Sequence, residues 1–364
     1  MTTDYEEIEG LLRPNIASLV PYSCARNDFT GVAEVYLDAN ENWRDFVGGQ
    51  GRNRYPDPLS TKVREGVERA LGLPASNLVV GNGSDEIIDL LMRIFCVPGK
   101  DSVMLLPPTY GAYRVFADIN DVAVRTCPLT PDFQFDFPAL EHALTAERAG
   151  RVPEGGRCKL LFICSPNNPT GNAFPLEQIE RICALFDGVT VVDEAYFDFS
   201  PYPSAATLSR RYPRLVVMRT LSKSWALANA RVGIAVACEA IVRTMINTKY
   251  PYNLGGPSQE LAVQALTQAP AVREAAQDIV EARDALACTL KKVPAVEKVF
   301  PSDANFLLVK VADPDALCLW LRDRGIIIRN RSRELHCQWC VRITVGSAIE
   351  NRRLVEALEE YGRG

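Results

Sequence analysis

Histidine is scarce in this sequence, which has only His142 and His336 among its 364 residues. A Ser-His-Asp hydrolase and a histidine-rich zinc site are therefore poorly supported. If the protein moves protons, lysine, tyrosine or carboxylate side chains must carry them. No apolar run comes near the roughly 20 residues that a membrane span needs. The net charge of −5 argues against nucleic acid as a main partner, because nucleic acid binds to basic surfaces.

The residue pattern also predicts neither a secretory leader nor a disulfide framework. Residues 1–10 are acidic and lack the charged and then apolar order of a secretory signal. The eleven cysteines are odd in number and scattered, which suits reduced thiols, and we expect a cytoplasmic protein. Cys337 and Cys340 form a C-x-x-C next to His336. Three candidate ligands beside a strand do not favour a metal site, so we expect no metal.

The composition that is present is ordinary and globular, with 47% hydrophobic and 23% charged residues over a length sufficient for two domains. Strand-like and helix-like segments alternate from residue 78 to 192. This alternation predicts an α/β fold whose mostly parallel sheet is covered by helices on both faces. We expect an N-terminal arm at 1–35, a large domain at 36–255 and a smaller C-terminal α/β domain at 256–364. Within the smaller domain, the apolar run 326–328 is expected to form a strand.

One lysine has neighbours that suggest chemistry. Lys223 follows the apolar run 215–218, with Ser222 directly before it and Arg231 eight residues after it. A lysine amine can form a Schiff base with an aldehyde cofactor. A hydroxyl and a guanidinium can bind the phosphate of such a cofactor. The alternative at this point is that Lys223 and Arg231 are solvated surface charges.

Further polar side chains come just after predicted strands. Asn167, Asp193 and Tyr196 each fall past a strand end, as Lys223 does. Ligands of parallel α/β sheets bind beyond the carboxyl ends of the strands. We therefore expect these four side chains to form one site.

A turn rich in glycine joins another predicted strand to a helix. Gly83, Ser84 and Asp85 occupy the start of that helix. The free N–H groups of a helix start can bind phosphate. An ordinary strand–turn–helix with a serine cap is the alternative.

Several separated segments resemble a known family, and the resemblance covers nearly the whole chain. It is to the fold-type I pyridoxal-phosphate-dependent aminotransferases and, within them, to the histidinol-phosphate aminotransferase family. It implies a fold with an arm, a large cofactor-binding domain and a small C-terminal domain, and it implies pyridoxal 5'-phosphate (PLP) as cofactor. The segments similar to the wider class are 164–171, 192–196 and 221–233, and those similar to the narrower family are 37–42, 55–58, 81–86 and 340–346.

The resemblance assigns roles around the cofactor ring. Lys223 would hold the cofactor aldehyde and later carry a proton between substrate and cofactor. Asp193 would pair with the pyridine nitrogen and keep it protonated. Asn167 and Tyr196 would donate to the phenolic oxygen, and Tyr110 would stack on the ring face.

The resemblance also assigns a phosphate site and a partner. Tyr55 would reach the cofactor phosphate of a neighbouring subunit, which implies a homodimer with shared active sites. Within one chain, the groups that would bind the phosphate are Gly83, Ser84, Asp85, Ser222 and Arg231.

Substrate recognition would fall mainly to arginines. Arg342 would bind the α-carboxylate of the amino-acid partner in the glutamate half-reaction, and Arg329 would bind a substrate phosphate, with Tyr22 closing from the arm. The other expected substrate contacts are Asn40, Tyr252 and Asn253.

The predicted activity is transamination of L-histidinol phosphate with 2-oxoglutarate, giving imidazole acetol phosphate and L-glutamate. Within the same fold, the alternatives are an aminotransferase for aromatic amino acids and a PLP-dependent decarboxylase of a phosphorylated amino acid. These families share Lys223, Asp193 and Arg231, so the sequence separates them poorly. A binding or regulatory protein that keeps the fold without catalysis is a further alternative, against which the presence of Lys223, Asp193 and Asn167 argues.

Overall fold

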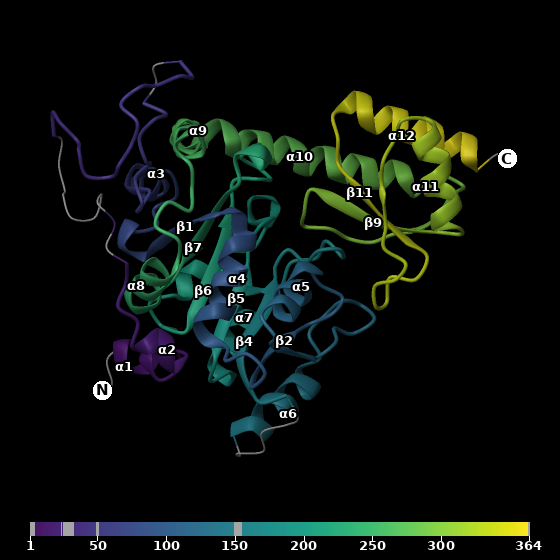
Figure 1. Ribbon diagram of the computed structural model, residues 1–364. Coiled ribbons are helices and arrows are strands. Elements are labelled where there is room, and N and C mark those ends of the chain that lie inside the picture. The colour runs from purple at the N-terminus through teal and green to yellow at the C-terminus, as the bar shows by residue number, and fades with distance from the viewer. Residues whose placement is uncertain (1–3, 23, 25–32, 49–50, 149–154, 363–364) are drawn as a thin grey trace.

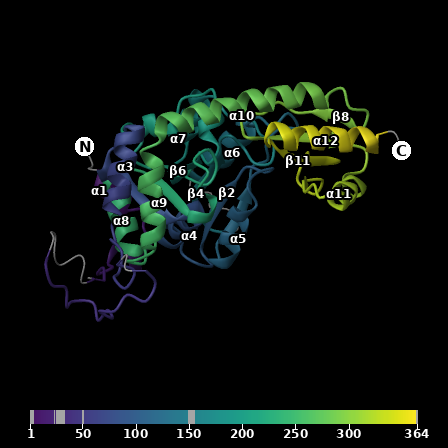
Figure 2. The same cartoon turned by 90° about the horizontal axis from the view of Figure 1, so that it is seen from above.

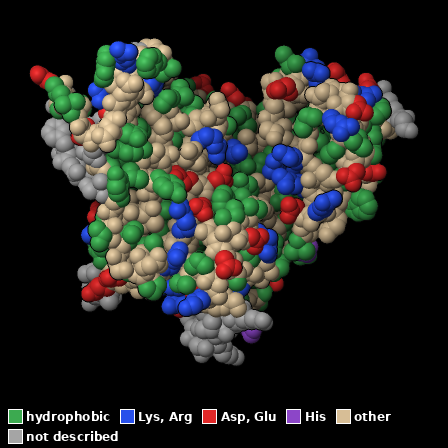
Figure 3. Space-filling model, viewed as in Figure 1, with side chains coloured by type: hydrophobic (Ala, Val, Ile, Leu, Met, Phe, Trp, Pro, Cys, Tyr) green, Lys and Arg blue, Asp and Glu red, His purple; other side chains and the backbone are tan. Residues whose placement is uncertain are grey.

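The computed structural model describes residues 4–22, 24, 33–48, 51–148 and 155–362. A large domain and a smaller C-terminal domain lie side by side, and helix α10 (Ala269–Leu290) runs along both of them (Figures 1 and 2). The space-filling view shows a notch where the two domains meet (Figure 3). Among these described residues, no helix combines the length and the apolar character that crossing a membrane requires.

The large domain is built on a seven-stranded sheet of order β1-β7-β6-β5-β4-β2-β3. The pairings from β3 through β2, β4 and β5 to β6 are parallel, whereas β7 is antiparallel to both β6 and β1. The prediction of a mostly parallel sheet is thereby confirmed. The strands are β1 (Leu78–Asn82), β2 (Asp101–Leu105), β3 (Ala123–Thr126), β4 (Arg157–Cys164), β5 (Val189–Asp193), β6 (Leu215–Thr220) and β7 (Val232–Val236).

Both faces of this sheet are buried, which explains why its central strands are continuous apolar runs. Successive side chains of a strand point to opposite faces. In β6, Val217 packs into the core on one face, while Val216 and Met218 pack into the core on the other. The helices on the Val217 face are α3 (Thr61–Leu71), α6 (Phe137–Arg148), α7 (Leu176–Leu185) and α9 (Gly256–Leu266), and those on the opposite face are α1 (Asp4–Glu9), α4 (Gly83–Phe95), α5 (Ala112–Ile119) and α8 (Glu239–Thr248).

The small domain contains an antiparallel sheet of order β10-β11-β9-β8. Leu286 and Leu290 of α10 pack into its core with Leu317 and Leu354 from two further helices. The division of the chain at residues 35 and 255 stays a prediction. The remaining elements are β8 (Val296–Val299), β9 (Phe306–Val311), β10 (Arg329–Asn330), β11 (Cys340–Thr344), α11 (Pro314–Asp323), α12 (Ala348–Tyr361), α2 (Pro14–Ala17) and the 3-10 helices η1 (Ala75–Asn77), η2 (Phe197–Phe199), η3 (Ala205–Leu208) and η4 (Ala228–Ala230).

The expected strand at 326–328 is wrong, because β10 begins only at Arg329. The backbone N–H of Ile326 donates to Leu321 O, which ties it to the end of α11. Gly325 has φ of 74°, so the chain reverses direction just before the apolar run. Ile326 and Ile328 pack against the small-domain core from a loop.

Candidate active site

The residues of the candidate site come together at one edge of the large sheet. Strands β1, β5 and β6 all end at this edge, at Asn82, Asp193 and Thr220. Strand β7 begins there, because it is antiparallel to β6. The N–H of Leu221 donates to Val232 O at 3.0 Å, which closes the base of the connection between the two strands. Lys223 and Arg231 both belong to this connection.

Two glycines allow the start of α4 to approach Arg231 closely. The Gly83 N–H donates to Arg231 O at 2.9 Å, and Gly83 has φ of 77°. A Cβ on Gly83 would lie 2.5 Å from Arg231 Nη2, and a Cβ on Gly233 would lie 2.3 Å from the Gly83 carbonyl carbon. Arg231 Nη2 is 3.3 Å from Asp85 Oδ2. The guanidinium of Arg231 and the start of α4, which includes Ser84, therefore form a cradle suited to an anion.

The buried carboxyl group of Asp193 accepts two hydrogen bonds. It is 3% exposed, and burial raises its pKa to about 6. The Tyr113 hydroxyl donates to Oδ2 at 2.7 Å and the Ala195 N–H donates to Oδ1 at 3.0 Å. Both hydrogen bonds lower the pKa, because they favour the charged form. This carboxyl suits a cationic partner such as a protonated ring nitrogen.

Lys223 lies within electrostatic reach of the other charged groups of the site. Burial lowers the pKa of its amine first, and the charge of Arg342 lowers it further, whereas Asp193 and Asp85 raise it. Its Nζ is 5.4 Å from the centroid of the Tyr196 ring. An amine with a lowered pKa is more often neutral and hence nucleophilic.

The side chains of Asn167 and Tyr110 are held in place by their own hydrogen bonds. Asn167 is 1% exposed, and its Nδ2 donates to Pro108 O at 2.8 Å and to Thr170 Oγ1 at 2.7 Å. The Tyr110 hydroxyl donates to Asp85 Oδ1 at 3.3 Å. Burial raises the pKa of Tyr110 to about 12, so its phenol is protonated at neutral pH.

Three further hydroxyl groups complete this part of the site. Thr220 Oγ1 lies 2.9 Å from Ser222 Oγ, next to Lys223. Tyr196 is 8% exposed, and burial raises the pKa of its phenol. Its ring contacts Phe306 of the small domain edge to face, with centroids 5.1 Å apart.

The small domain contributes an arginine to the same place. Arg342 on β11 donates from Nη1 to Asn168 Oδ1 of the large domain at 2.5 Å. Arg329 on β10 is its direct register partner, so the two arginines lie side by side on neighbouring strands. Burial lowers the pKa of Arg342, and the neighbouring charge of Arg329 contributes to the same direction. The pair gives the site two positive charges suited to an anionic substrate.

Other predicted residues are placed elsewhere within the single chain. Tyr22 is 75% exposed. Asn40 and Tyr55 line a separate pocket of about 500 Å³. The Tyr55 ring stacks on Tyr252 with centroids 4.4 Å apart, and Asn253 donates to Val80 O and Glu86 Oε2. These contacts gather around the segments 39–58 and 250–254.

Tyr113 is a site residue that the sequence reasoning missed. In sequence it is one more apolar position of a helix, and it is 0% exposed in the core under the sheet. Its one signal is its spacing, because it lies only three residues after Tyr110, whose ring it contacts with centroids 5.4 Å apart.

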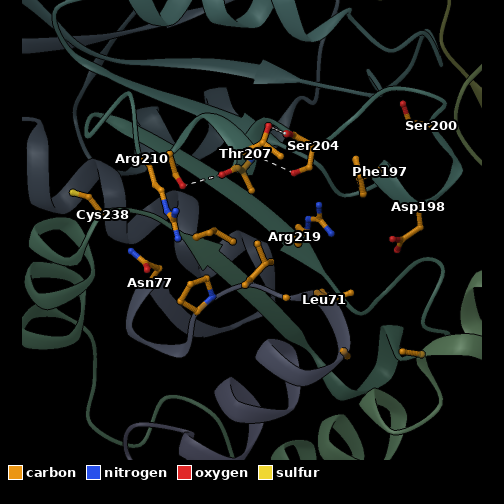
Figure 4. Close-up of a pocket in the computed structure, with 18 of the residues that line it drawn as sticks. Leu71, Asn77, Phe197, Asp198, Ser200, Ser204, Thr207, Arg210, Arg219 and Cys238 are labelled. Carbon is orange, nitrogen blue, oxygen red and sulfur yellow. Dashed lines mark hydrogen bonds between the residues drawn. The ribbon is translucent and has the colours of Figure 1, made fainter.

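A large pocket lies behind the Lys223 segment. It measures about 1160 Å³ and is lined by Trp225, Asp198 and Arg219 together with parts of α3, α8 and α10. In Figure 4, Arg210 reaches toward Asn77 in this pocket. None of the predicted site residues lines it. Among the described residues, no group of three or more His, Cys, Asp and Glu side chains is arranged to bind a metal.

Comparisons with known proteins agree with this arrangement. The family model for aminotransferase class I and II matches residues 25–358. A histidinol-phosphate aminotransferase from Cytophaga hutchinsonii is 42% identical over 97% of this chain and 99% of its own length.

Two solved structures share the fold. A histidinol-phosphate aminotransferase from Clostridium acetobutylicum has a TM-score of 0.76 and 21% identity, covering 86% of this chain and 92% of its own. One from Sinorhizobium meliloti, in complex with pyridoxal-5'-phosphate, has a TM-score of 0.75 and 22% identity, covering 86% and 84%.

The family match over residues 25–358 and the 42% identity to the Cytophaga hutchinsonii protein show that the chain is a PLP-dependent aminotransferase of class I and II, and its fold agrees with that class. Within that class, the chain belongs to the histidinol-phosphate aminotransferase family.

Proposed function

We propose that the protein binds PLP and transfers the amino group of L-histidinol phosphate to 2-oxoglutarate, giving imidazole acetol phosphate and L-glutamate. The observation that carries the proposal is the convergence of Asp193 on β5, Lys223 in the connection after β6, and Arg342 on β11 of the small domain. The name of the relative that is 42% identical over nearly the full length supports the choice of substrate.

The donor set fits PLP at three points. The cradle of Gly83, Ser84 and Arg231 suits its phosphate, the buried Asp193 suits its protonated ring nitrogen, and the amine of Lys223 suits its aldehyde. When bound, PLP supplies an electrophilic carbon and a ring that accepts an electron pair. Asn167 and Tyr196 would orient the phenolic oxygen, while Tyr110 would cover the ring and Asp85 and Ser222 would support the phosphate site.

The protein's own residues would handle the proton and the substrate. Lys223 Nζ would carry the proton from the substrate Cα to the aldehyde-derived carbon of the cofactor, because burial favours its neutral form. Arg342 would bind the carboxylate of glutamate, and Arg329 beside it would bind the phosphate of L-histidinol phosphate. Both anions would then be fixed by neighbouring strands of one sheet.

We propose that the remaining predicted residues act in a cytoplasmic homodimer. The exposed rings of Tyr22 and Tyr55 and the position of Asn40 on the same outer segment suit contact with a second copy. Tyr55 would there reach the partner's PLP phosphate. Tyr252, which stacks on Tyr55, and Asn253 behind it would lie at the substrate side of that shared site.

Absorbance tests the cofactor part of the proposal. Purified protein mixed with PLP should develop a visible band that borohydride removes, and Lys223→Ala should not develop it. A wild-type protein without the band would refute PLP chemistry.

Single-turnover reactions test the substrate. L-histidinol phosphate should react faster than phenylalanine and threonine phosphate, and Arg329→Ala should slow the phosphorylated substrate far more than phenylalanine. Equal or faster reaction with phenylalanine would favour an aromatic aminotransferase instead. Release of carbon dioxide from threonine phosphate would favour the decarboxylase.

A further inference from the structure

Lys249 occupies a cage of oxygen atoms at the end of α8. Its Nζ donates to Pro58 O at 2.7 Å, Asn253 Oδ1 at 2.9 Å, and the carbonyl oxygens of Tyr250 and Pro251 at 3.1 Å each. An ammonium has three hydrogens, so one of them is shared between two of these oxygens. Burial lowers the pKa of Lys249, and the nearby Glu86, Cys24 and Asp57 raise it.

The cage follows from two proline-containing segments. Residues 55–58 and 250–253 each contain proline, which lacks an N–H and keeps the chain extended. The carbonyl groups of Pro58, Tyr250 and Pro251 accept hydrogen bonds from Lys249, and a partly buried carbonyl needs such a donor. The ammonium of Lys249 supplies that donor to both segments at once.

A chain of hydrogen bonds leads from this cage to the cradle beside Arg231. Asn253 accepts from Lys249 through Oδ1, and its Nδ2 donates to Glu86 Oε2 at 2.8 Å and to Val80 O at 3.0 Å. Glu86 Oε2 also accepts from the Asn82 N–H at 2.5 Å, one residue before Gly83. Both ends of the Asn253 amide are thus used within the protein, and its orientation is set by the charge of Lys249.

The same ammonium also acts on the two stacked tyrosines. Pro58 lies three residues after Tyr55, and Tyr252 lies three residues after Lys249. The rings of Tyr55 and Tyr252 stack with an interplanar angle of 17°. By bonding to both segments, Lys249 holds the backbones that carry these rings at a fixed separation.

We propose that Lys249 is a positioning residue whose ammonium acts as a built-in monovalent cation. Through Asn253 and Glu86 it fixes the turn that begins α4, and through Pro58 it keeps Tyr55 against Tyr252. The link to the phosphate rests on the proposed function, whereas the oxygen cage does not.

Chemical rescue tests the proposal, with pyridoxamine 5'-phosphate as the probe because it has no aldehyde that added amines could trap. Lys249→Ala leaves the cage vacant. We expect the affinity of the apoprotein for this probe to fall by about tenfold or more, because a charged hydrogen-bond network is lost. Ammonium or ethylammonium chloride should restore most of the affinity, and tetramethylammonium chloride, which cannot donate, should not. Lys249→Met fills the space without a charge and should resist rescue.

A matched control separates the cage from a general effect of a lysine at a helix end. Lys291 is an exposed C-cap residue of α10, as Lys249 is the C-cap of α8. Lys291→Ala should bind the probe like the wild type. Equal binding by Lys249→Ala, or weak binding that no ammonium ion restores, would overturn the proposal.

The outcomes also distinguish this inference from the proposed function. If the wild-type apoprotein does not bind pyridoxamine 5'-phosphate, the cofactor assignment is refuted. The role of the cage is then measured by the midpoint temperature of thermal unfolding. In that case ammonium should still raise the midpoint of Lys249→Ala and leave that of Lys249→Met unchanged. If Lys249→Ala does not fold, refolding with ammonium present should recover it, and failure to do so counts against the proposal.

Discussion

The Tyr113 hydroxyl donates a hydrogen bond to Asp193 Oδ2 at 2.7 Å in a part of the core where the two side chains are 0% and 3% exposed. The Tyr113 ring is fixed by stacking on Phe162, with centroids 4.8 Å apart. This hydrogen bond opposes the effect of burial on the carboxyl, because it favours the ionised form. Tyr113 therefore helps to keep Asp193 charged and to set its orientation.

Removing that hydroxyl should weaken cofactor binding. Tyr113→Phe keeps the ring and its stacking, but it should raise the pKa of Asp193 and reduce PLP affinity about 10- to 100-fold, as for loss of a hydrogen bond to a charged group. Titration of the apoprotein with PLP from pH 5 to 8 measures both effects. Tyr212→Phe is the control, since it removes a hydroxyl bonded to Glu180 outside the site. Equal PLP affinity in the wild type and Tyr113→Phe would contradict the assigned role.

Replacing Asp193 by asparagine should stabilise the apoprotein at neutral pH while it weakens PLP binding. The folded pKa of about 6 lies above the ordinary 3.8, so ionisation of this group destabilises the fold as pH rises through that interval. The shift corresponds to about 3 kcal/mol once both states are ionised. Urea unfolding should therefore show Asp193→Asn gaining on the wild type as pH rises from about 4 to about 6.5, the interval between the two pKa values. A gap that stays constant over this range would disprove the pKa assignment.

Arg219 and Glu194 form a buried ion pair with nitrogen and oxygen 3.0 Å apart. Glu194 also accepts from the Ser204 hydroxyl and the Ala205 N–H, both at 2.7 Å. Arg219→Met leaves the carboxylate without its cation and should cost about 3 kcal/mol of unfolding free energy at pH 8. The loss of unfolding free energy should shrink as pH falls, because protonation removes the charge of Glu194. The double variant with Arg219→Met and Glu194→Gln should recover part of the lost stability. A loss independent of pH would mean that packing, rather than charge, is responsible.

Arg342 should tune Lys223 as well as bind substrate. Its positive charge is the largest influence on the Lys223 pKa after burial, so Arg342→Met should raise that pKa. The pH dependence of Lys223 acetylation in the apoprotein, followed by mass spectrometry, measures the change. Arg329→Met is the matched control, because Arg329 is the register partner of Arg342 and does not act on Lys223 to a comparable degree. An unchanged acetylation midpoint in Arg342→Met would rule out this coupling.

The sequence was sufficient to predict the α/β class and the central strands, because β4, β5 and β6 are apolar runs buried on both faces. It could not predict strand direction, since an apolar run has the same pattern in either orientation. The antiparallel placement of β7 between β6 and β1 therefore emerges only from the structure. The error at 326–328 has a similar origin, because Ile326 and Ile328 can pack on the core from a loop as well as from a strand.

The candidate site shows the same limit. The placement of Asp193 and Lys223 near one sheet edge could be predicted, because Asp193 ends β5 and Lys223 comes three residues after the end of β6. Tyr113 could not, since a tyrosine on the buried face of a helix looks like core until its hydroxyl is seen beside a carboxylate. The proposed role of Tyr55 involves a second chain, so no pattern within one chain can place it; its role and that of Tyr22 stay predictions.

The antiparallel pairing of β7 with β6 fixes the positions of Lys223 and Arg231 relative to each other. Lys223 and Arg231 sit on one short loop whose two ends are bonded to adjacent strands of a single rigid sheet. A shift of the small domain would move Arg342, but it would leave the distance between the Lys223 amine and the Arg231 guanidinium unchanged. In the proposed function, cofactor binding by Lys223 and Arg231 would therefore be independent of substrate binding by Arg342.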